Sequence, residues 1–430
     1  RIETPGDLPE LTLQRLIILS LAVAWMRHPH RRSLREVPFA GLMAGWAGVA
    51  LISLVGAVDL VAGVKRYLEF VFELFVFYFI LATTLHSRED ALRLLRAAVL
   101  ALSIVATLAI VERYTGLNMV DRFIGQDPES RVLRDVRVTY RHRILLGAGL
   151  AMAFPLAAAM TQLATKRLHR LLAWLAFGAM AAGCYFSMSR GPWLALILAA
   201  LVLIAFGGRA LRKPLMVAGV AVVLVLLSHP GVYGTLFNKA ADTVDTDSFK
   251  GGTFQYRLEL YSVAYEGIKR SPWRLCFGNG PAAGLHQSIE WELSYRGKNY
   301  NIASWDNDFA YALFQYGFLG LAVTLALYGR VAGRLLVLAR QSSGRQRDLF
   351  VCLCASALAL FFMMSNVHIF ARQLYYLFWT VAAVGFTIAE AATKPEARSF
   401  PRAEIPGEDW LGQAESPTPE FAGSSLNPIP

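Results

Sequence analysis

Charged residues are scarce in this sequence of 430 residues. Asp, Glu, Lys and Arg make up 17% of it and hydrophobic residues 55%, and the mean hydropathy is +0.43. Soluble domains carry about 25% charged residues, whereas an apolar block of about 20 residues is long enough to cross a bilayer. The composition therefore excludes an ordinary soluble enzyme and predicts an all-α polytopic membrane protein.

Cysteine is also rare, and the four cysteines do not form a metal-binding pattern. They are Cys184, Cys276, Cys352 and Cys354, of which three lie inside apolar blocks. Neither a disulfide framework nor a CxxC pair for zinc is present. We therefore expect no metal site, and we expect Cys276 to be a small buried apolar residue.

Apolar windows of about 16 to 22 residues predict about eleven membrane-spanning helices. In chain order they cover 11–26, 37–55, 67–85, 97–111, 144–164, 171–186, 192–206, 215–227, 309–328, 350–364 and 375–391. We assign 1–392 to the transmembrane domain, including one large loop at 228–308 that carries short helices. The polar segment 393–430 is expected to be a disordered tail.

Basic residues set the predicted orientation. The connectors after the first, third, fifth, seventh and ninth spans are short and basic, so they are assigned to the cytoplasm. Loop 112–143 is an exception because it contains seven arginines, but long loops follow the charge rule less strictly. Residue 1 then lies outside. We expect a missing N-terminal span that would bring the full-length chain to twelve.

The net charge of +11 has a simple explanation in a membrane protein. Basic residues fall mainly between the apolar blocks, where they fix topology and contact anionic lipid. We therefore predict membrane lipids as partners and no nucleic acid.

Two arginines lie on the predicted outer side. Arg190 belongs to the turn SMSRG at 187–191, and Arg257 belongs to FQYRLELYSVAYEGIKRSPW at 254–273, whose apolar spacing predicts an amphipathic helix. Each has a simpler alternative: Arg190 as an interface charge that reaches toward water, and Arg257 as a solvated charge on a helix face.

The large loop ends with two further polar elements. Gly278 and Gly280 form a glycine-rich turn, FGNGPAAG, which offers backbone N–H groups to a phosphate. Asp306, Asn307 and Asp308 then open the ninth span. Helix capping is the simpler explanation for both acids.

Taken in order, these motifs resemble the O-antigen ligase and polymerase family of bacterial membrane glycosyltransferases. The family patterns are SxSRG, an arginine before an aromatic-rich helix, a GxGxG-like turn, and HNxxLxxLxxxGxxG, and the resemblance covers roughly 144–328. In the last pattern Asp306 stands where the ligases have histidine, and Asn307 matches the asparagine. This difference favours a polymerase of O-antigen or exopolysaccharide repeats over a ligase that transfers the glycan to lipid A core.

The resemblance implies a substrate and a mechanism. The donor is a glycan on a polyprenyl diphosphate, the acceptor is a glycan or lipid hydroxyl, and other polysaccharide-assembly proteins are implied partners. Transfer is expected at the periplasmic side of the bacterial inner membrane without metal or cofactor. Arg190 and Arg257 are expected to stabilise the leaving diphosphate, and Asp306 to accept the acceptor's proton. Asn307 and Asp308 are expected to bind substrate, with Gly278 and Gly280.

Two other pairs of charged residues have both a functional and a structural explanation. Glu69 and Glu73 lie one helical turn apart in the third span and are predicted to contact substrate, unless they pair with Lys65, Arg66 or another arginine. Arg141 and Arg143 precede the fifth span. They are predicted to attract the anionic lipid head group or to anchor the helix.

A lipid-linked oligosaccharide transporter is the alternative class. A transporter needs polar residues distributed through the membrane interior on several helices. Here the polar candidates gather on one side, with only Glu69 and Glu73 deeper in the membrane. The sequence therefore favours a transferase.

Overall fold

The computed structural model describes most of the chain up to residue 393. The described residues are 13–27, 32–118, 136–140, 142–213, 215–216, 219–220, 249–286, 291–295, 298–302, 304–368 and 373–393. Residues up to Thr393 belong to one compact unit. The predicted tail lies outside the described residues from residue 394 onward.

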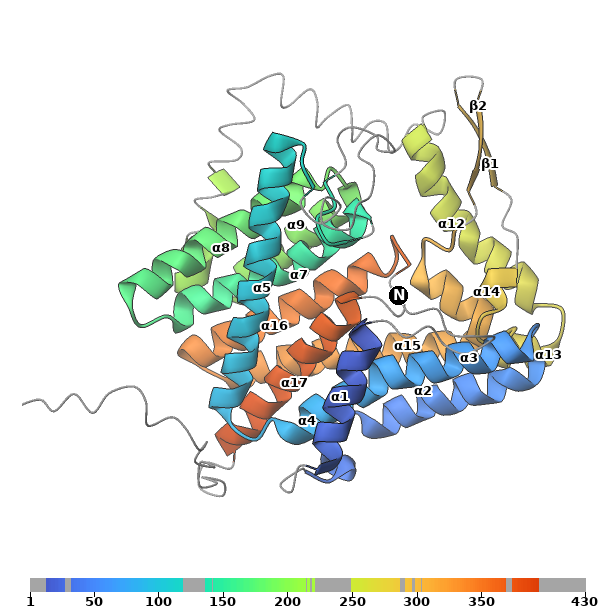
Figure 1. Cartoon of the computed structure of the whole chain (residues 1–430), viewed down its shortest axis with the longest axis horizontal. Coiled ribbons are helices and arrows are strands. Elements are labelled where there is room, and N and C mark those ends of the chain that lie inside the picture. Colours follow the sequence, from blue (N-terminus) through green and yellow to red (C-terminus); the bar gives the residue numbers. More distant parts are fainter. Residues whose placement is uncertain are drawn as a thin grey trace, which may run out of the picture. The chain divides into compact units, whose positions relative to one another are not determined.

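Helices dominate the described residues (Figure 1). They are α1 (Leu13–Arg27), α2 (Ala40–Ser53), α3 (Leu60–Phe70), a π-helix (Val71–Val76), α4 (Phe77–Thr84), α5 (Arg88–Thr115), α7 (Arg143–Leu163), α8 (Arg167–Phe186), α9 (Arg190–Phe206), α12 (Phe249–Ile268), α13 (Pro272–Phe277), α14 (Ala283–His286), α15 (Asp308–Gln341), α16 (Gly344–Met363) and α17 (Gln373–Thr393). Short 3₁₀-helices precede and follow α2, at Leu34–Glu36 and Leu54–Gly56.

The predicted class, an all-α polytopic membrane protein, is confirmed. Among the described residues, six helices are long and apolar enough to cross a membrane. They are Leu60–Thr84, Arg88–Thr115, Arg143–Leu163, Asp308–Gln341, Gly344–Met363 and Leu374–Thr393. Two shorter apolar helices, Ala40–Gly56 and Arg190–Phe206, accompany them. The predicted total of about eleven spans is not confirmed.

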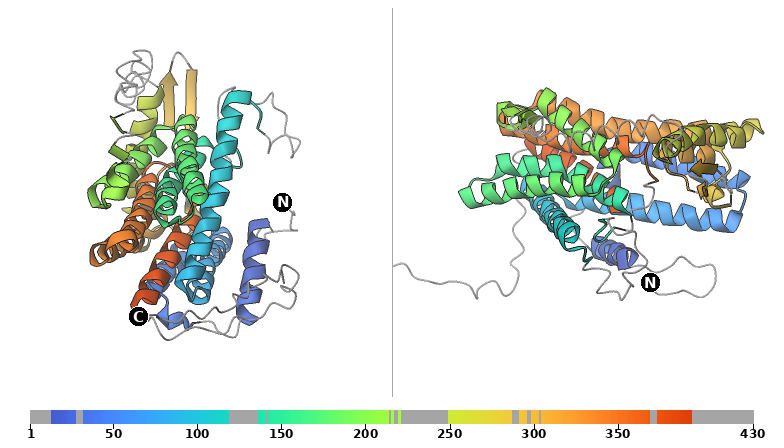
Figure 2. Two further views of the ribbon diagram at one scale, coloured as in Figure 1. Left: turned by 90° about the vertical axis from the view of Figure 1, so that its left-hand side faces the viewer. Right: turned by 90° about the horizontal axis from the view of Figure 1, so that it is seen from above.

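Helix α7 forms the centre of the bundle. It packs against α5, α8, α9 and α16, and every residue from Leu145 to Thr161 is buried. Alanine and glycine occupy many of these positions, and small residues let neighbouring helices approach closely within a membrane. Helix α1 lies at the edge of the bundle and packs on α4 and the π-helix (Figure 2).

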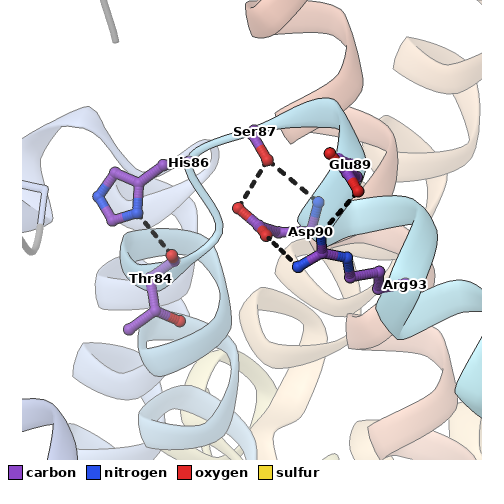
Figure 3. Close-up of polar contacts among 6 residues, drawn as sticks. All are labelled: Thr84, His86, Ser87, Glu89, Asp90 and Arg93. Atoms are coloured by element: carbon purple, nitrogen blue, oxygen red, sulfur yellow. Dashed lines mark hydrogen bonds and ion pairs between the residues drawn. The ribbon is translucent and has the colours of Figure 1, made fainter. Parts of the chain in front are cut away.

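Two of the basic connectors, those after the third and ninth predicted spans, are largely helical. Helix α5 begins at Arg88, where the Ser87 side chain accepts a hydrogen bond from the Asp90 N–H at 3.1 Å (Figure 3). Helix α15 continues through the basic segment after residue 329 as far as Gln341. The part of α15 at 318–341 alone spans about 36 Å at 1.5 Å per residue, more than the bilayer core of about 30 Å.

The large loop contains the expected helices and also a β-hairpin. The helix predicted at 254–273 runs from Phe249 to Ile268, and α13 begins separately at Pro272, which Ser271 caps. Strands β1 (Trp291–Tyr295) and β2 (Lys298–Ile302) pair antiparallel, with Trp291 opposite Ile302. In Figure 1 this hairpin lies beside α12.

The cysteines are unpaired, and one of them departs from its predicted burial. Cys184, Cys352 and Cys354 are buried in the bundle, as apolar blocks predict. Cys276 is exposed instead, because it lies near the end of the short helix α13, only part of which faces its neighbours.

Helix α15 is broken at Gly317, whose backbone is not helical (φ 66°, ψ −166°). A break of this kind frees backbone carbonyls from the helix ladder, and inside a membrane protein they need other partners. The carbonyls of Phe314 and Gln315 accept hydrogen bonds from the N–H groups of Asn279 and Gly280, at 3.1 and 2.9 Å. The large loop is therefore joined to α15 through backbone bonds at the break.

Gly317→Ala is expected to destabilise the protein. A Cβ at this position would lie 2.5 Å from the Cys276 carbonyl carbon and oxygen, and the positive φ adds strain of about 1–3 kcal/mol. The measurement is thermal unfolding of the detergent-solubilised protein. Gly333→Ala in the same helix is the control, because nothing lies within 4 Å of the place that its Cβ would occupy; an equal effect of both variants would contradict the expectation.

Candidate functional site

Asn307 caps helix α15, a role that the sequence suggested for the flanking acids. Its Oδ1 accepts hydrogen bonds from the N–H groups of Phe309 and Ala310 at 3.0 and 3.1 Å. Its Nδ2 donates to the Arg257 carbonyl at 3.5 Å. Asn307, which we predicted to bind substrate, is buried, and these bonds attach α12 to the start of α15.

Asp306 and Arg257 lie next to each other above this cap. Arg257 Nη2 is 3.7 Å from Asp306 Oδ2, and the side chains keep 20% and 31% of their surface exposed. The structure thus brings together Arg257, which we expect to stabilise the leaving diphosphate, and Asp306, which we expect to accept a proton. Both are accessible enough to meet a substrate.

Tyr256 fixes the backbone beside this pair. It is buried, and its hydroxyl donates to the Ser304 carbonyl two residues before Asp306. Burial, with a smaller contribution from the Asp306 carboxylate, raises the pKa of Tyr256 to about 12. The hydroxyl therefore stays protonated and keeps donating at physiological pH.

Asp308, which we predicted to bind substrate, is fully buried. Its side chain has 0% exposure, and its Oδ1 lies 2.8 Å from His368 Nδ1. Its backbone N–H donates to the Met364 carbonyl at 2.8 Å. Asp308 instead connects the start of α15 to the segment 364–368 that follows α16.

His368 is a candidate that the sequence analysis missed. It lies in a connector on the same side, 60 residues from its partner Asp308, and no local motif marks it. In the sequence, the one feature that could have pointed to His368 is its place between the predicted spans 350–364 and 375–391, on the same predicted side of the membrane as Arg190, Arg257 and Asp306.

Arg190 reaches the same region through its turn. It is the first residue of α9, and a Cβ on the next residue, Gly191, would lie 3.5 Å from the Asn366 Cβ. Asn366 belongs to the segment that also bonds Asp308. The Arg190 turn and the start of α15 therefore contact one shared segment.

Gly278 and Gly280 serve packing. The N–H groups of Gly278, Asn279 and Gly280 all donate to backbone carbonyls, those of Arg274, Phe314 and Gln315. A Cβ at Gly278 would lie 2.3 Å from the Gln315 carbonyl, and one at Gly280 would lie 2.6 Å from Ala57. The N–H groups that we expected to bind a phosphate therefore have protein partners.

Glu69 and Glu73 form ion pairs, in agreement with the structural alternative. Arg15 Nη2 lies 3.1 Å from Glu69 Oε1, and Arg15 Nε lies 2.8 Å from Glu73 Oε1. Arg66 Nη1 lies 3.2 Å from Glu69 Oε2. These contacts tie α1 to α3 and the π-helix, so they favour a structural role over substrate contact.

Of the two arginines before the fifth span, only one can be placed. Arg143 is the first residue of α7, which His142 caps by accepting the Ile144 N–H at 3.2 Å. This end of α7 adjoins the Arg190 turn, since a Cβ at Gly147 would lie 2.6 Å from Ser187 Oγ. Arg141 lies outside the described residues.

The comparisons with known proteins agree with the order of motifs. A family model described as O-antigen ligase matches residues 175–325, a segment that contains Arg190, Arg257 and Asp306. No match was found among curated proteins. The family supports a role in surface polysaccharide assembly and, at a general level, an enzymatic activity that uses polyprenyl-linked glycan and lipid acceptor substrates. Residues 175–325 of this multi-pass membrane protein are thus similar to the O-antigen ligase family, which confirms the resemblance seen in the sequence.

Proposed function

We propose that this protein polymerises repeat units of O-antigen or exopolysaccharide. The donor is a glycan on a polyprenyl diphosphate, and the acceptor is a sugar hydroxyl of another lipid-linked repeat. The reaction takes place at the periplasmic face of the inner membrane, without a metal ion, and other polysaccharide-assembly proteins supply the donor. The observation that carries the proposal is the partly exposed pair Arg257–Asp306 at the start of α15.

Arg257 is proposed to stabilise the leaving group. Transfer breaks the bond between the anomeric carbon and a phosphate oxygen, so negative charge grows on the diphosphate. A guanidinium is permanently charged and can bind two phosphate oxygens at once. Arg190 is proposed as a second cation, because its turn packs on the segment that also holds Asp308.

Asp306 is proposed to accept the proton of the attacking hydroxyl. A carboxylate within hydrogen-bond reach of that hydroxyl is typically worth about 10²–10⁴-fold in rate. The capping of α15 by Asn307 supports this role, because Asp306 is not needed as the helix cap.

Polymerisation is preferred over ligation because aspartate occupies the position of the ligase histidine. A ligase that moves a finished glycan to lipid A core is the second candidate, and the description of the matching family as O-antigen ligase favours it.

The test is complementation of a polysaccharide-producing strain that lacks this protein. Arg190→Ala, Arg257→Ala and Asp306→Asn are each expected to leave single lipid-linked repeats, whereas the wild type restores long chains. Glu259→Gln, an exposed acid on α12, is the control and should restore them too. If all three site variants restored long chains, the proposed site would be wrong. Long chains that accumulate in the null strain without reaching lipid A core would favour a ligase.

A further inference from the structure

The buried pair Asp308–His368 has no role in the function proposed above. Asp308 is fully buried, and a buried carboxylate is costly unless it is paired or hydrogen-bonded. Its 2.8 Å contact with His368 Nδ1 meets that need. The His368 side chain keeps 18% of its surface exposed, so one edge of the pair is buried and the other reaches toward water.

The imidazole is held on a second side as well. The Tyr311 ring lies edge-on to it, with ring centroids 4.4 Å apart and an interplanar angle of 65°. Tyr311 is buried and interacts electrostatically with Arg66 of α3. Together, the carboxylate and the ring fix the orientation of His368.

Such an arrangement defines which nitrogen exchanges protons. The Asp308 carboxylate accepts a hydrogen bond from the Nδ1–H group of the neutral imidazole, so the lone pair that can accept a proton is on Nε2. Carboxylate–histidine pairs act in this way when histidine serves as a general base.

We infer that His368, oriented by Asp308, takes up the proton released during glycan transfer. This inference rests on the proposed function and extends it. The acceptor O–H bond breaks and its oxygen bonds to the anomeric carbon. The bond from that carbon to the phosphate oxygen breaks, and its electron pair stays on the diphosphate. The proton, accepted first at Asp306, ends on His368 Nε2 and is then lost to water.

Both ends of the proposed proton path lie at the start of α15, since His368 bonds Asp308 there. Asp306 and Asp308 are two residues apart at the start of α15, with the Asn307 cap between them. His368 contacts Asp308 and Tyr311 of α15. Tyr311 interacts electrostatically with Arg66 of α3, and Asp308 with Tyr328 of α15 and Tyr375 of α17. Asp308 is the charged group that bonds His368 directly, so its charge is the one expected to govern His368.

The test is the pH dependence of transfer by the purified full chain in liposomes, with a synthetic polyprenyl-diphosphate-linked repeat. The wild-type rate is expected to fall at acidic pH, because an imidazole that already carries a proton cannot accept another. His368→Gln is expected to lower the rate at pH 7.5 by about 10²-fold or more and to remove this limb of the profile. Asp308→Asn is expected to lower the rate and move the limb. His169→Gln, an exposed histidine on α8, is the control.

Imidazole rescue separates a chemical role from a structural one. Added imidazole is expected to restore part of the rate of folded His368→Ala, which loss of packing alone does not predict. An unchanged rate and pH profile in His368→Gln, with Arg257→Ala inactive, would overturn the inference and leave the proposed function standing. Full activity of Arg257→Ala and Asp306→Asn would overturn the proposed function itself.

Discussion

Arg257→Ala is expected to slow glycan transfer by about 10²–10³-fold, the usual loss when one charged donor to a developing anion is removed. Arg257 Nη2 lies 3.7 Å from Asp306 Oδ2, and both side chains remain partly exposed. The substitution removes the cation without touching the cap of α15, because Asn307 bonds the backbone carbonyl of residue 257. The measurement is the initial rate of repeat transfer, with unfolding measured in parallel.

Arg257→Lys makes this prediction sharper. Lysine keeps the charge but loses the planar fork that binds two phosphate oxygens, so we expect a rate between those of the wild type and of Arg257→Ala. Lys269→Ala removes an exposed cation directly after the last residue of α12. It is the matched control and should keep the wild-type rate. Equal rates for Arg257→Ala and Lys269→Ala would contradict a role for Arg257 in catalysis.

Arg15→Ala is expected to destabilise the protein by about 3–5 kcal/mol, the usual loss when one partner of a buried ion pair is removed. Arg15 lies 3.1 Å from Glu69 and 2.8 Å from Glu73. Arg66 remains for Glu69, but Glu73, which is buried, would lose its ion pair with Arg15. The measurement is reversible unfolding in detergent with increasing denaturant.

Two comparisons isolate the ion pair. Adding Glu73→Gln to Arg15→Ala is expected to recover part of the loss, because the amide removes the uncompensated charge. Arg93→Ala breaks the exposed pair of Arg93 with Glu89, and exposed pairs contribute about 0–1 kcal/mol. If Arg15→Ala cost no more than Arg93→Ala, Glu69 and Glu73 would again be available as substrate contacts.

The boundaries of α15 illustrate what a hydropathy pattern can predict. The apolar window 309–328 located the start of the helix within one residue but ended 13 residues too early, since α15 extends to Gln341. Hydropathy detects burial in the membrane, whereas a helix continues wherever its backbone bonds are satisfied and its residues favour helix. The break at Gly317 was not expected, because a glycine in the sequence does not reveal its φ.

The sequence predicts those residues of the candidate site that belong to recognisable motifs or lie close together in the chain. Arg257 and Asp306 were both identified from such motifs, and the structure brings them together. The roles of Asn307 and Asp308 could not be separated, because consecutive polar residues at a helix start differ only in where their side chains point. His368 was missed because its partner lies 60 residues away, and such a pairing depends on how α15 and α16 pack.

The glycine turn was misread for a related reason. A GxG sequence predicts N–H groups that can bind a ligand only if no backbone carbonyl accepts their hydrogen bonds. Here the break in α15 supplies carbonyl acceptors for the N–H groups of Asn279 and Gly280. Sequence reasoning treated the turn and the helix as separate elements. The hydrogen bonds between the turn and α15 depend on the break at Gly317, which the sequence does not predict.

The most direct test of the central claim is chain extension by the purified protein. Liposomes would contain the protein and a synthetic polyprenyl-diphosphate-linked repeat, and the products would be separated by length. We expect products of two or more repeats with the wild type and with Glu259→Gln, and unextended single repeats with the combined variant Arg257→Ala/Asp306→Asn. Products of wild-type length from the combined variant, folded and inserted normally, would contradict the assignment of this site to glycan transfer.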